Sequence, residues 1–297
     1  MKAISVENQY EKFSDLEKSE VLKLMEWTNR QKHLPDIEEI EAILFLYSCH
    51  NSMELAKQTV DLNFTLRTLC PEFFAKRDTS SSDIQRAMKV CGIAPLPYTT
   101  AKGEKIIVSK MINPDPNEFH FADVIKLYFM CFDFWMMQEG TASGHILACD
   151  MNGCVLGHIL RLSPFLMKKF LFYLQEACPV RIRGFHFINT VPFMDKLLAI
   201  MKPFMKKELM NVMHLHQSVE TFHEYVPKEY LPEDYGGPKE SLKTHYERFY
   251  EDLKNNQDFF TKEEQTRRVD EKQRPGKPKV ASDLFGVEGN FKKLDID

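Results

Sequence analysis

The sequence lacks any apolar run long enough to span a lipid bilayer. Its longest apolar stretch, residues 124–137, is interrupted by Lys126 and Asp133, whereas a spanning helix needs about 20 consecutive, mostly apolar residues. Residues 1–18 contain no apolar core of the length found in signal peptides. We therefore expect a cytosolic protein that meets membrane surfaces only transiently.

Paired cysteines are absent too. The seven cysteines are scattered and form no C-x-x-C motif, so a zinc ribbon or a thioredoxin-like site is not supported, and dispersed single cysteines fit a reducing compartment. His214 and His216 share one face of a short predicted strand, as two metal ligands do, but no third ligand stands at a plausible spacing. We interpret them as structural histidines and expect neither a metal nor a cofactor.

Motifs for nucleotide chemistry and nucleophilic catalysis are also missing. Neither G-x-x-x-x-G-K nor G-x-G-x-x-G occurs, and the serine between Gly140 and Gly144 does not have G-x-S-x-G spacing. Asp133 lies in an apolar helix, where a buried and unpaired carboxylate is costly; a partner, an N-cap or a solvent-facing position is favoured over catalysis. We expect a protein that is not an enzyme, with a hydrolase as the remote alternative.

The sequence has no excess of basic residues. The 39 lysines and arginines against 43 acidic residues give a net charge of −4, so no global basic field attracts nucleic acid or anionic membranes. By contrast, 23 phenylalanines and 15 methionines are many for a chain of ordinary polarity. Such adaptable side chains suit either a thick core or an apolar pocket.

Helical patterns dominate the first third of the sequence. Residues 15–32, 37–49 and 53–69, and a short segment from Ser82, carry apolar residues at helical spacing, with acidic or hydroxyl residues near their starts. We predict an all-helical module over residues 1–92. Pro95 and Pro97 are interpreted as the junction that follows it.

Strands and helices then alternate. The predicted strands are residues 106–108, 144–149, 183–189 and 212–216, and the main predicted helices are 121–138, 164–177 and 190–205, the last with Pro192 at its first position. This alternation predicts an α/β domain with a mostly parallel sheet over residues 93–255.

The last part of the chain changes character. From Thr261 the residues are charged and include proline and glycine, which is typical of a linker. Apolar residues return at Leu284, Phe285 and the segment 291–294. We predict a linker and a C-terminal tail over residues 256–297, and we expect the tail to dock on the body.

The most specific pattern runs from Arg181 to His216. A strand GFHFIN, a helix ending in KPF and then LPEDYGG at residues 231–237 occur in this order. Together they closely resemble the CRAL-TRIO lipid-binding family, which includes carriers of tocopherol and retinaldehyde; the tail is similar to those of invertebrate members. The resemblance covers about residues 15–255. It implies a helical module, an α/β domain around an apolar lipid cavity, and a gate formed by the helix at 190–205.

The resemblance also implies residues that enclose a hydrophobic ligand, with Tyr128 and His145 as candidate polar handles. For each residue, plain core packing is the alternative. Tyr128 and Phe132 stand where the tocopherol carrier has small residues, which reshapes the pocket. The candidate ligand-binding residues are Ile125, Tyr128, Phe132, Trp135, His145, Cys149, Leu162, Phe170, Leu174, Phe185, Phe193, Leu197, Leu198, Met201 and Met205.

A second candidate site is basic. Arg181 and Arg183 alternate along a strand and so share a face, and paired guanidinium groups bind phosphate well. In the family, matching basic residues bind phosphatidylinositol bisphosphate and trigger lipid release. Two positions of that family cluster are Glu208 and Val212 here. Lys206 and Lys207 complete the candidate phosphoinositide site as possible replacements.

These features predict a monomeric cytosolic carrier that moves a hydrophobic small molecule between membranes, without nucleic acid as a partner. The rival hypothesis is a lipid-sensing scaffold or adaptor that binds its lipid but does not transfer it. Tocopherol, retinoid, carotenoid, sterol and phospholipid remain open as cargo.

Overall fold

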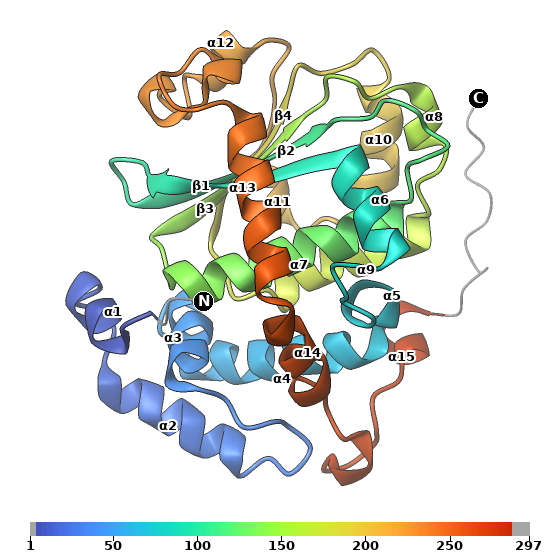
Figure 1. Cartoon of the computed structure of the whole chain (residues 1–297). Helices are drawn as coiled ribbons and strands as arrows, with labels where there is room; N and C mark the ends of the chain where they lie inside the picture. Colours follow the sequence, from blue (N-terminus) through green and yellow to red (C-terminus); the bar gives the residue numbers. More distant parts are fainter. Residues whose placement is uncertain (1–3, 287–297) are drawn as a thin grey trace.

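A five-stranded sheet with the order β1-β2-β3-β4-β5 organises the molecule, which this computed structural model describes over residues 4–286 (Figure 1). β1 and β2 pair antiparallel, and the remaining neighbours pair parallel. This confirms the predicted α/β class. The strands are β1 (Cys91–Thr99), β2 (Glu104–Met111), β3 (Gly144–Asp150), β4 (Ile182–Ile188) and β5 (Met213–Leu215).

Helices connect the parallel strands, as parallel pairing requires. One face of the sheet packs against α7, α9 and α10, and Leu147 and Phe185 point to this side. The neighbouring residues Ile146 and Ala148 point to the other face, where they meet residues that follow β5. The connecting elements are α7 (Phe121–Glu139), α8 (Leu156–Ile159), α9 (Pro164–Glu176), α10 (Met194–Met201), η1 (Lys202–Phe204) and α11 (Lys207–Asn211).

The N-terminal helices form a second core of their own. This core packs below the sheet domain in Figure 1, where α3 contacts α7 and α4 contacts α9. The helices of this core are α1 (Val6–Lys12), α2 (Lys18–Asn29), α3 (Glu39–Ser48) and α4 (Met53–Leu69), whereas α5 (Pro71–Phe74) and α6 (Ser82–Val90) pack against α7 in the main core.

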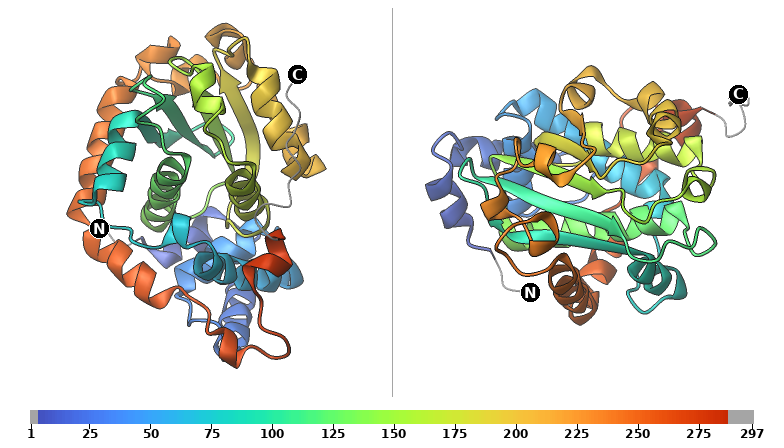
Figure 2. Two further views of the ribbon diagram at one scale, coloured as in Figure 1. Left: turned by 90° about the vertical axis from the view of Figure 1, so that its right-hand side faces the viewer. Right: turned by 90° about the horizontal axis from the view of Figure 1, so that it is seen from above.

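The elements after β5 run down one side of the molecule from the sheet to the N-terminal helices (Figure 2). At Gly237, a Cβ atom would lie 1.9 Å from the Leu231 carbonyl oxygen, so the LPEDYGG turn requires glycine there. The elements are α12 (Val219–Phe222), η2 (Lys228–Tyr230), η3 (Glu233–Tyr235), α13 (Leu242–Asn255), α14 (Gln257–Thr266), η4 (Glu271–Gln273) and α15 (Ala281–Phe285).

The segment predicted as a linker is instead bound to the body. Helix α14 continues through Thr261 to Thr266, and the buried Arg267 guanidinium then donates to both carboxylate oxygens of Glu41, at 2.7 and 2.8 Å. Phe285 is buried and its ring meets that of Phe172 on α9. Charged composition predicted a linker, but partners far away in the sequence neutralise those charges. The apolar residues at 291–294 lie outside the described part.

Two prolines were misassigned. Pro95 and Pro97 lie inside β1 rather than in a junction. β1 is an edge strand, where the missing N–H of proline can face away from the ladder.

The helix predicted to begin at Pro192 begins at Met194 and ends at Met201, with Pro203 in the following 3-10 turn. Within residues 4–286, no helix is long and apolar enough to cross a membrane.

Asp133 has partners, as the sequence favoured. Its carboxylate accepts from Arg67 at 2.6 and 2.9 Å and from Arg77 at 2.6 Å, and both guanidinium groups also contact Glu263 of α14. We call Arg67, Arg77, Asp133 and Glu263 the ion cluster. Burial opposes ionisation, but the two guanidinium groups lower the pKa of Asp133. The cluster joins α4, α7 and α14 across the base of the sheet domain.

Candidate functional site

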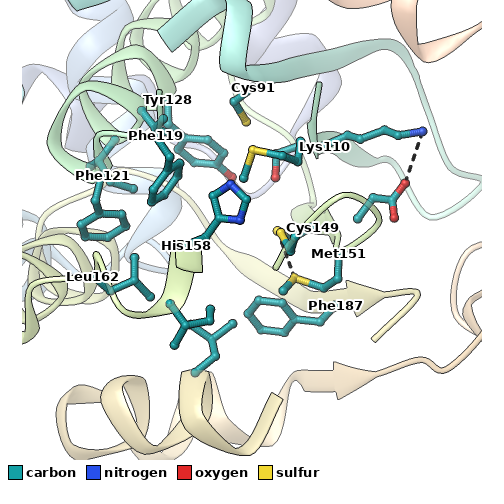
Figure 3. Close-up of a pocket in the computed structure, with 18 of the residues that line it drawn as sticks. Cys91, Lys110, Phe119, Phe121, Tyr128, Cys149, Met151, His158, Leu162 and Phe187 are labelled. Carbon is teal, nitrogen blue, oxygen red and sulfur yellow. Dashed lines mark hydrogen bonds and ion pairs between the residues drawn. The ribbon is translucent and has the colours of Figure 1, made fainter. Parts of the chain in front are cut away.

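A cavity of about 180 Å³ lies between the sheet and the helices on one of its faces (Figure 3). Leu147 and Cys149 of β3 and Phe185 and Phe187 of β4 form its floor. These four side chains point the same way because strand residues two apart share a face. Helices α7, α8, α9 and α10 supply most of the remaining walls, and residues of β1, β2 and the loops complete them.

Eight predicted residues lie at this cavity. Ile125 and Tyr128 come from α7, one helical turn apart. Leu197 and Met201 come from α10, four residues apart and therefore on one face of that helix. The full set is Ile125, Tyr128, Cys149, Leu162, Phe170, Phe185, Leu197 and Met201.

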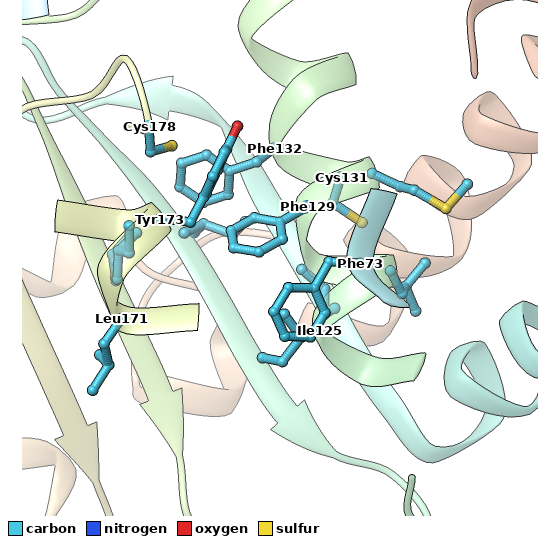
Figure 4. Packing of buried hydrophobic residues seen from close by; sticks show 14 of the residues in the cluster. Phe73, Ile125, Phe129, Cys131, Phe132, Leu171, Tyr173 and Cys178 are labelled. Atoms are coloured by element: carbon cyan, nitrogen blue, oxygen red, sulfur yellow. The ribbon is translucent and has the colours of Figure 1, made fainter. Parts of the chain in front are cut away.

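The structure places the other seven predicted residues elsewhere. Phe132 stacks on Tyr128 with ring centroids 5.3 Å apart, and Trp135 meets Phe132 edge to face. Both residues lie on the predicted face of α7 and belong to the packed core, but neither lines the cavity. Figure 4 shows Phe132 among its core neighbours. The residues away from the cavity are Phe132, Trp135, His145, Leu174, Phe193, Leu198 and Met205.

His145, one of the two predicted polar handles, is buried beside Lys105 and not at the cavity. Its imidazole packs between the rings of Phe132 and Trp135, at centroid distances of 6.4 and 5.7 Å. Burial, with the nearby Lys105 ammonium, lowers the pKa of His145 to about 3. A neutral, enclosed imidazole at this position serves packing.

Several lining residues were not predicted. Phe119, Met151, Cys154, His158 and Ile159 come from loops or from the four-residue helix α8, which are too short to show a periodic pattern. The segment between the predicted strand β3 and the predicted helix α9 is rich in apolar residues, and this was the signal in the sequence that could have identified it as part of the cavity wall. The further lining residues are Cys91, Ser109, Lys110, Met111, Phe121, Val124, Leu147, Ala148, Asp150, Met167 and Phe187.

Few polar groups face the cavity. Tyr128 is half-buried at the cavity, and its hydroxyl makes no hydrogen bond to the described part of the chain. His158 is only 2% exposed, and its Nε2 atom has no hydrogen-bond partner there either. An unpaired buried polar group costs about 1–3 kcal/mol. Figure 3 shows the His158 ring extending from α8 into the middle of the lining side chains.

Three thiols belong to the wall. Burial raises the pKa of Cys149 to about 11 and that of Cys154 to about 12, and it also raises the pKa of Cys91. They are therefore neutral near pH 7 and act as small apolar groups.

The predicted basic residues partly converge on a separate surface groove of about 720 Å³, which Arg181, Arg183 and Lys206 line together with Glu208. The Arg181 Nε atom donates to the Tyr47 carbonyl oxygen at 2.7 Å, and the Lys206 ammonium is ion-paired with Glu176. Lys207 is exposed and does not line the groove.

His214 and His216 lie on the opposite side of the sheet from the cavity. The His216 Nε2 atom lies 2.9 Å from Nδ1 of His186, and His214 packs on the ring of Tyr225 at 4.2 Å. In the part of the chain that the structure describes, no group of three or more His, Cys, Asp or Glu side chains is arranged to hold a metal.

Comparison with known proteins agrees with this architecture. The family model described as the CRAL/TRIO domain matches residues 89–237, half of the chain. The chain belongs to the CRAL-TRIO family. A second model, described as a Pinta-like UBA domain, matches residues 13–84 in the N-terminal helices. The cavity thus lies within the CRAL-TRIO domain.

Two named relatives support the same assignment. Alpha-tocopherol transfer protein-like of Homo sapiens is 29% identical over 154 residues, which are 50% of this chain and 44% of that protein. Clavesin-1 of Rattus norvegicus is 25% identical over 176 residues, 59% of this chain and 50% of that protein. The chain therefore spans about half the length of the curated relatives it matches.

A solved structure shares the fold. The crystal structure of Sfh5 aligns with a TM-score of 0.51 at 11% identity, and it covers 82% of this CRAL-TRIO chain and 93% of that chain. At this identity, the likeness extends to the fold alone.

Proposed function

We propose that this protein is a carrier that binds a hydrophobic small molecule in the cavity and moves it between membranes. The observation that carries the proposal is the apolar cavity enclosed by the sheet and α7–α10 within a CRAL-TRIO domain. Burying about 250 Å² of apolar ligand at about 25 cal/mol per Å² contributes about 6 kcal/mol, enough to hold a lipid. The carrier role requires no catalytic step, in line with the expectation that the protein is not an enzyme.

Helix α10 is proposed as the gate. It forms one wall through Leu197 and Met201, while its residue Ala199 is exposed to solvent. A volume of about 180 Å³ is below the about 300–1,000 Å³ of typical ligand pockets. A lipid-sized cargo therefore requires the wall to move, and the methionines that line it repack readily.

The membrane contact is proposed at α8. Val155 is 41% exposed, Leu156 39% and Leu160 68%, whereas His158 and Ile159 of the same segment line the cavity. One short segment thus has an apolar outer surface and an inner surface facing the cargo. An exposed apolar cluster of this kind suits insertion into a lipid surface.

Phosphoinositide-triggered release is proposed for the groove at Arg181, Arg183 and Lys206. Burial and both guanidinium groups lower the pKa of the nearby His50, which is consistent with a positive potential there. Glu208 and the Lys206–Glu176 pair oppose an anionic ligand. Vesicles with and without phosphatidylinositol bisphosphate, compared for the wild-type protein and Arg183→Ala, test this step.

A vesicle assay tests the function as a whole. The purified full chain is mixed with donor vesicles that carry a fluorescent lipid analogue and with unlabelled acceptor vesicles. A carrier accelerates transfer in proportion to protein concentration. Binding of the analogue without transfer favours the lipid-sensing scaffold or adaptor, and the absence of both contradicts the proposal. Native mass spectrometry of the purified protein identifies the cargo.

A further inference from the structure

The His158 imidazole is held in one tautomer by its own short helix. The Val155 backbone N–H donates to Nδ1 of His158 at 3.0 Å. The Val155 carbonyl oxygen also lies near Nδ1, at 3.3 Å, but the N–H contact is the shorter one and a backbone N–H can only donate, so we assign Nδ1 as the acceptor. Burial lowers the pKa of His158, and the ring is therefore neutral near pH 7. In a neutral ring with Nδ1 unprotonated, the proton resides on Nε2. The cavity wall thus carries an N–H donor at a defined place.

This donor has no acceptor among the described residues. Its nearest ring neighbour, Phe119, lies perpendicular to it with centroids 5.3 Å apart, and an aromatic ring is a weak partner for an N–H group. His33 and His145 also have an unpaired buried nitrogen, but neither lines the cavity. His158 is therefore the buried orphan donor that a bound molecule can reach.

The charges around the cavity decide which acceptor fits. The lining residue Asp150 accepts from Asn189 at 2.9 Å and from the Tyr235 hydroxyl at 3.1 Å, and the Lys110 ammonium lies 3.7 Å from it. The charges of Lys110 and Asp150 thus offset each other. A carboxylate or phosphate inside the cavity would be desolvated without a counter-charge, and an ammonium group would be equally unpaired.

We propose that His158 and Tyr128 form the polar anchor of the cavity and select a lipid that carries an uncharged oxygen, such as a hydroxyl or an ester or ketone carbonyl, over hydrocarbons and fatty-acid anions. The Nε2–H group of His158 donates to the oxygen of the ligand. The Tyr128 hydroxyl can donate to the same oxygen or accept from a ligand hydroxyl. This inference rests on the proposed function, because it specifies the cargo of the same cavity.

The test compares variants on probes that share one chain length. Hexadecanol, methyl hexadecanoate, hexadecane and hexadecanoate are each supplied in phosphatidylcholine vesicles, and the probe bound to re-isolated protein is extracted and quantified. His158→Phe removes the donor and retains an apolar ring. We expect it to lower binding of hexadecanol and the ester by about tenfold and to leave hexadecane binding within about twofold of wild type. Tyr128→Phe should lower hexadecanol binding by about threefold.

Matched controls separate anchoring from structural damage. His145→Leu removes an equally buried imidazole away from the cavity and should leave every probe unchanged. His158→Gln retains an N–H donor and should recover part of the hexadecanol binding. Because His158 also receives the Val155 N–H, thermal melts confirm that α8 variants fold, and Tyr128→Phe provides a test that leaves this contact intact.

Two results would overturn the anchor. Either the variants lower the binding of all four probes equally, or wild type retains hexadecanoate as well as it retains hexadecanol. In both cases lipids still bind, and the carrier proposal stands. If the wild-type protein binds no probe at all, the carrier proposal fails and the anchor fails with it.

Discussion

Two regions on either side of α7 treat buried polar groups in opposite ways. In the ion cluster, the Asp133 carboxylate makes three hydrogen bonds to guanidinium groups, and Glu263 neutralises the remaining charge. In the cavity, the His158 Nε2 atom is left without a partner among the described residues. Both regions lie in the interior of the molecule.

The two regions differ in whether their buried charged and polar groups find partners within the chain. The charges of the ion cluster balance one another, and the cluster joins three helices distant in sequence, so its role is structural. The cavity wall is unsaturated and is lined by adaptable methionine and aromatic side chains. Arg77 Nε and His145 Nδ1 are also buried without a partner among the described residues, but they do not line the cavity. The Nε2 atom of His158 does, so a bound molecule can satisfy it.

The largest expected effect concerns the ion cluster. Asp133→Asn leaves Arg67 and Arg77 buried with too little negative charge, so the free energy of unfolding should fall by about 3–5 kcal/mol. Urea denaturation measures the change. Glu247→Gln, which breaks the exposed pair with Lys243, is the control and should cost less than about 0.5 kcal/mol. A loss for Asp133→Asn as small as the control's would contradict a structural role for the cluster.

Acid should act first on the buried imidazoles of His145 and His186 and only later on the ion cluster. Burial lowers the pKa of His145 and of His186 to about 3, so below pH 6.5 the unfolded chain takes up protons that the folded chain does not. Stability therefore falls as pH drops from 6.5, by about 2 kcal/mol for each histidine at pH 5. Asp133 has a lowered pKa, so its contribution is lost only when the pH falls further, through that folded-state value.

Urea denaturation at pH 7 and pH 5 tests this order. His145→Leu should reduce the difference between the two pH values by about 2 kcal/mol. An unchanged difference would show that His145 already binds a proton in the folded protein, and it would count against its burial as a neutral ring.

Filling the cavity should reduce ligand binding more than it reduces stability. In Cys149→Phe, the larger side chain occupies space between β3 and α10, and we expect lipid binding to weaken at least about tenfold. The control is Cys49→Phe, at a half-buried thiol away from the cavity. Lipid retention from vesicles reports binding, and equal retention by both variants would mean that the cargo lies elsewhere.

The smallest expected effect concerns the outer surface of α8. Leu160→Ser should slow vesicle-to-vesicle transfer by about threefold, because one exposed apolar side chain contributes about 0.7 kcal/mol or more to membrane contact. Leu22→Ser, at a leucine 48% exposed on α2, should leave transfer unchanged. If both variants transfer at the wild-type rate, membranes do not bind at α8.

Local patterns predicted one part of the site and failed for another. Helical spacing placed Ile125, Tyr128, Phe132 and Trp135 on one face of α7, and all four point to the sheet side of its core. Spacing gives the direction of a side chain around the helix axis but not where along the axis a cavity ends. Phe132 and Trp135 were therefore assigned to a wall that stops before them. His158 was missed because α8 has only one turn.

The alternation of the four strands β2–β5 with α7, α9 and α10, the family and the apolar character of these segments could be obtained from the sequence alone, because each depends on residues close together in the chain. Tertiary structure alone decided which polar atoms find partners. Arg67 and Asp133 meet across 66 positions, and Arg267 binds Glu41 across 226. Whether a buried polar group finds a hydrogen-bond partner depends on such distant contacts. Neither the ion cluster nor the unpaired Nε2 atom of His158 can therefore be seen in the local sequence.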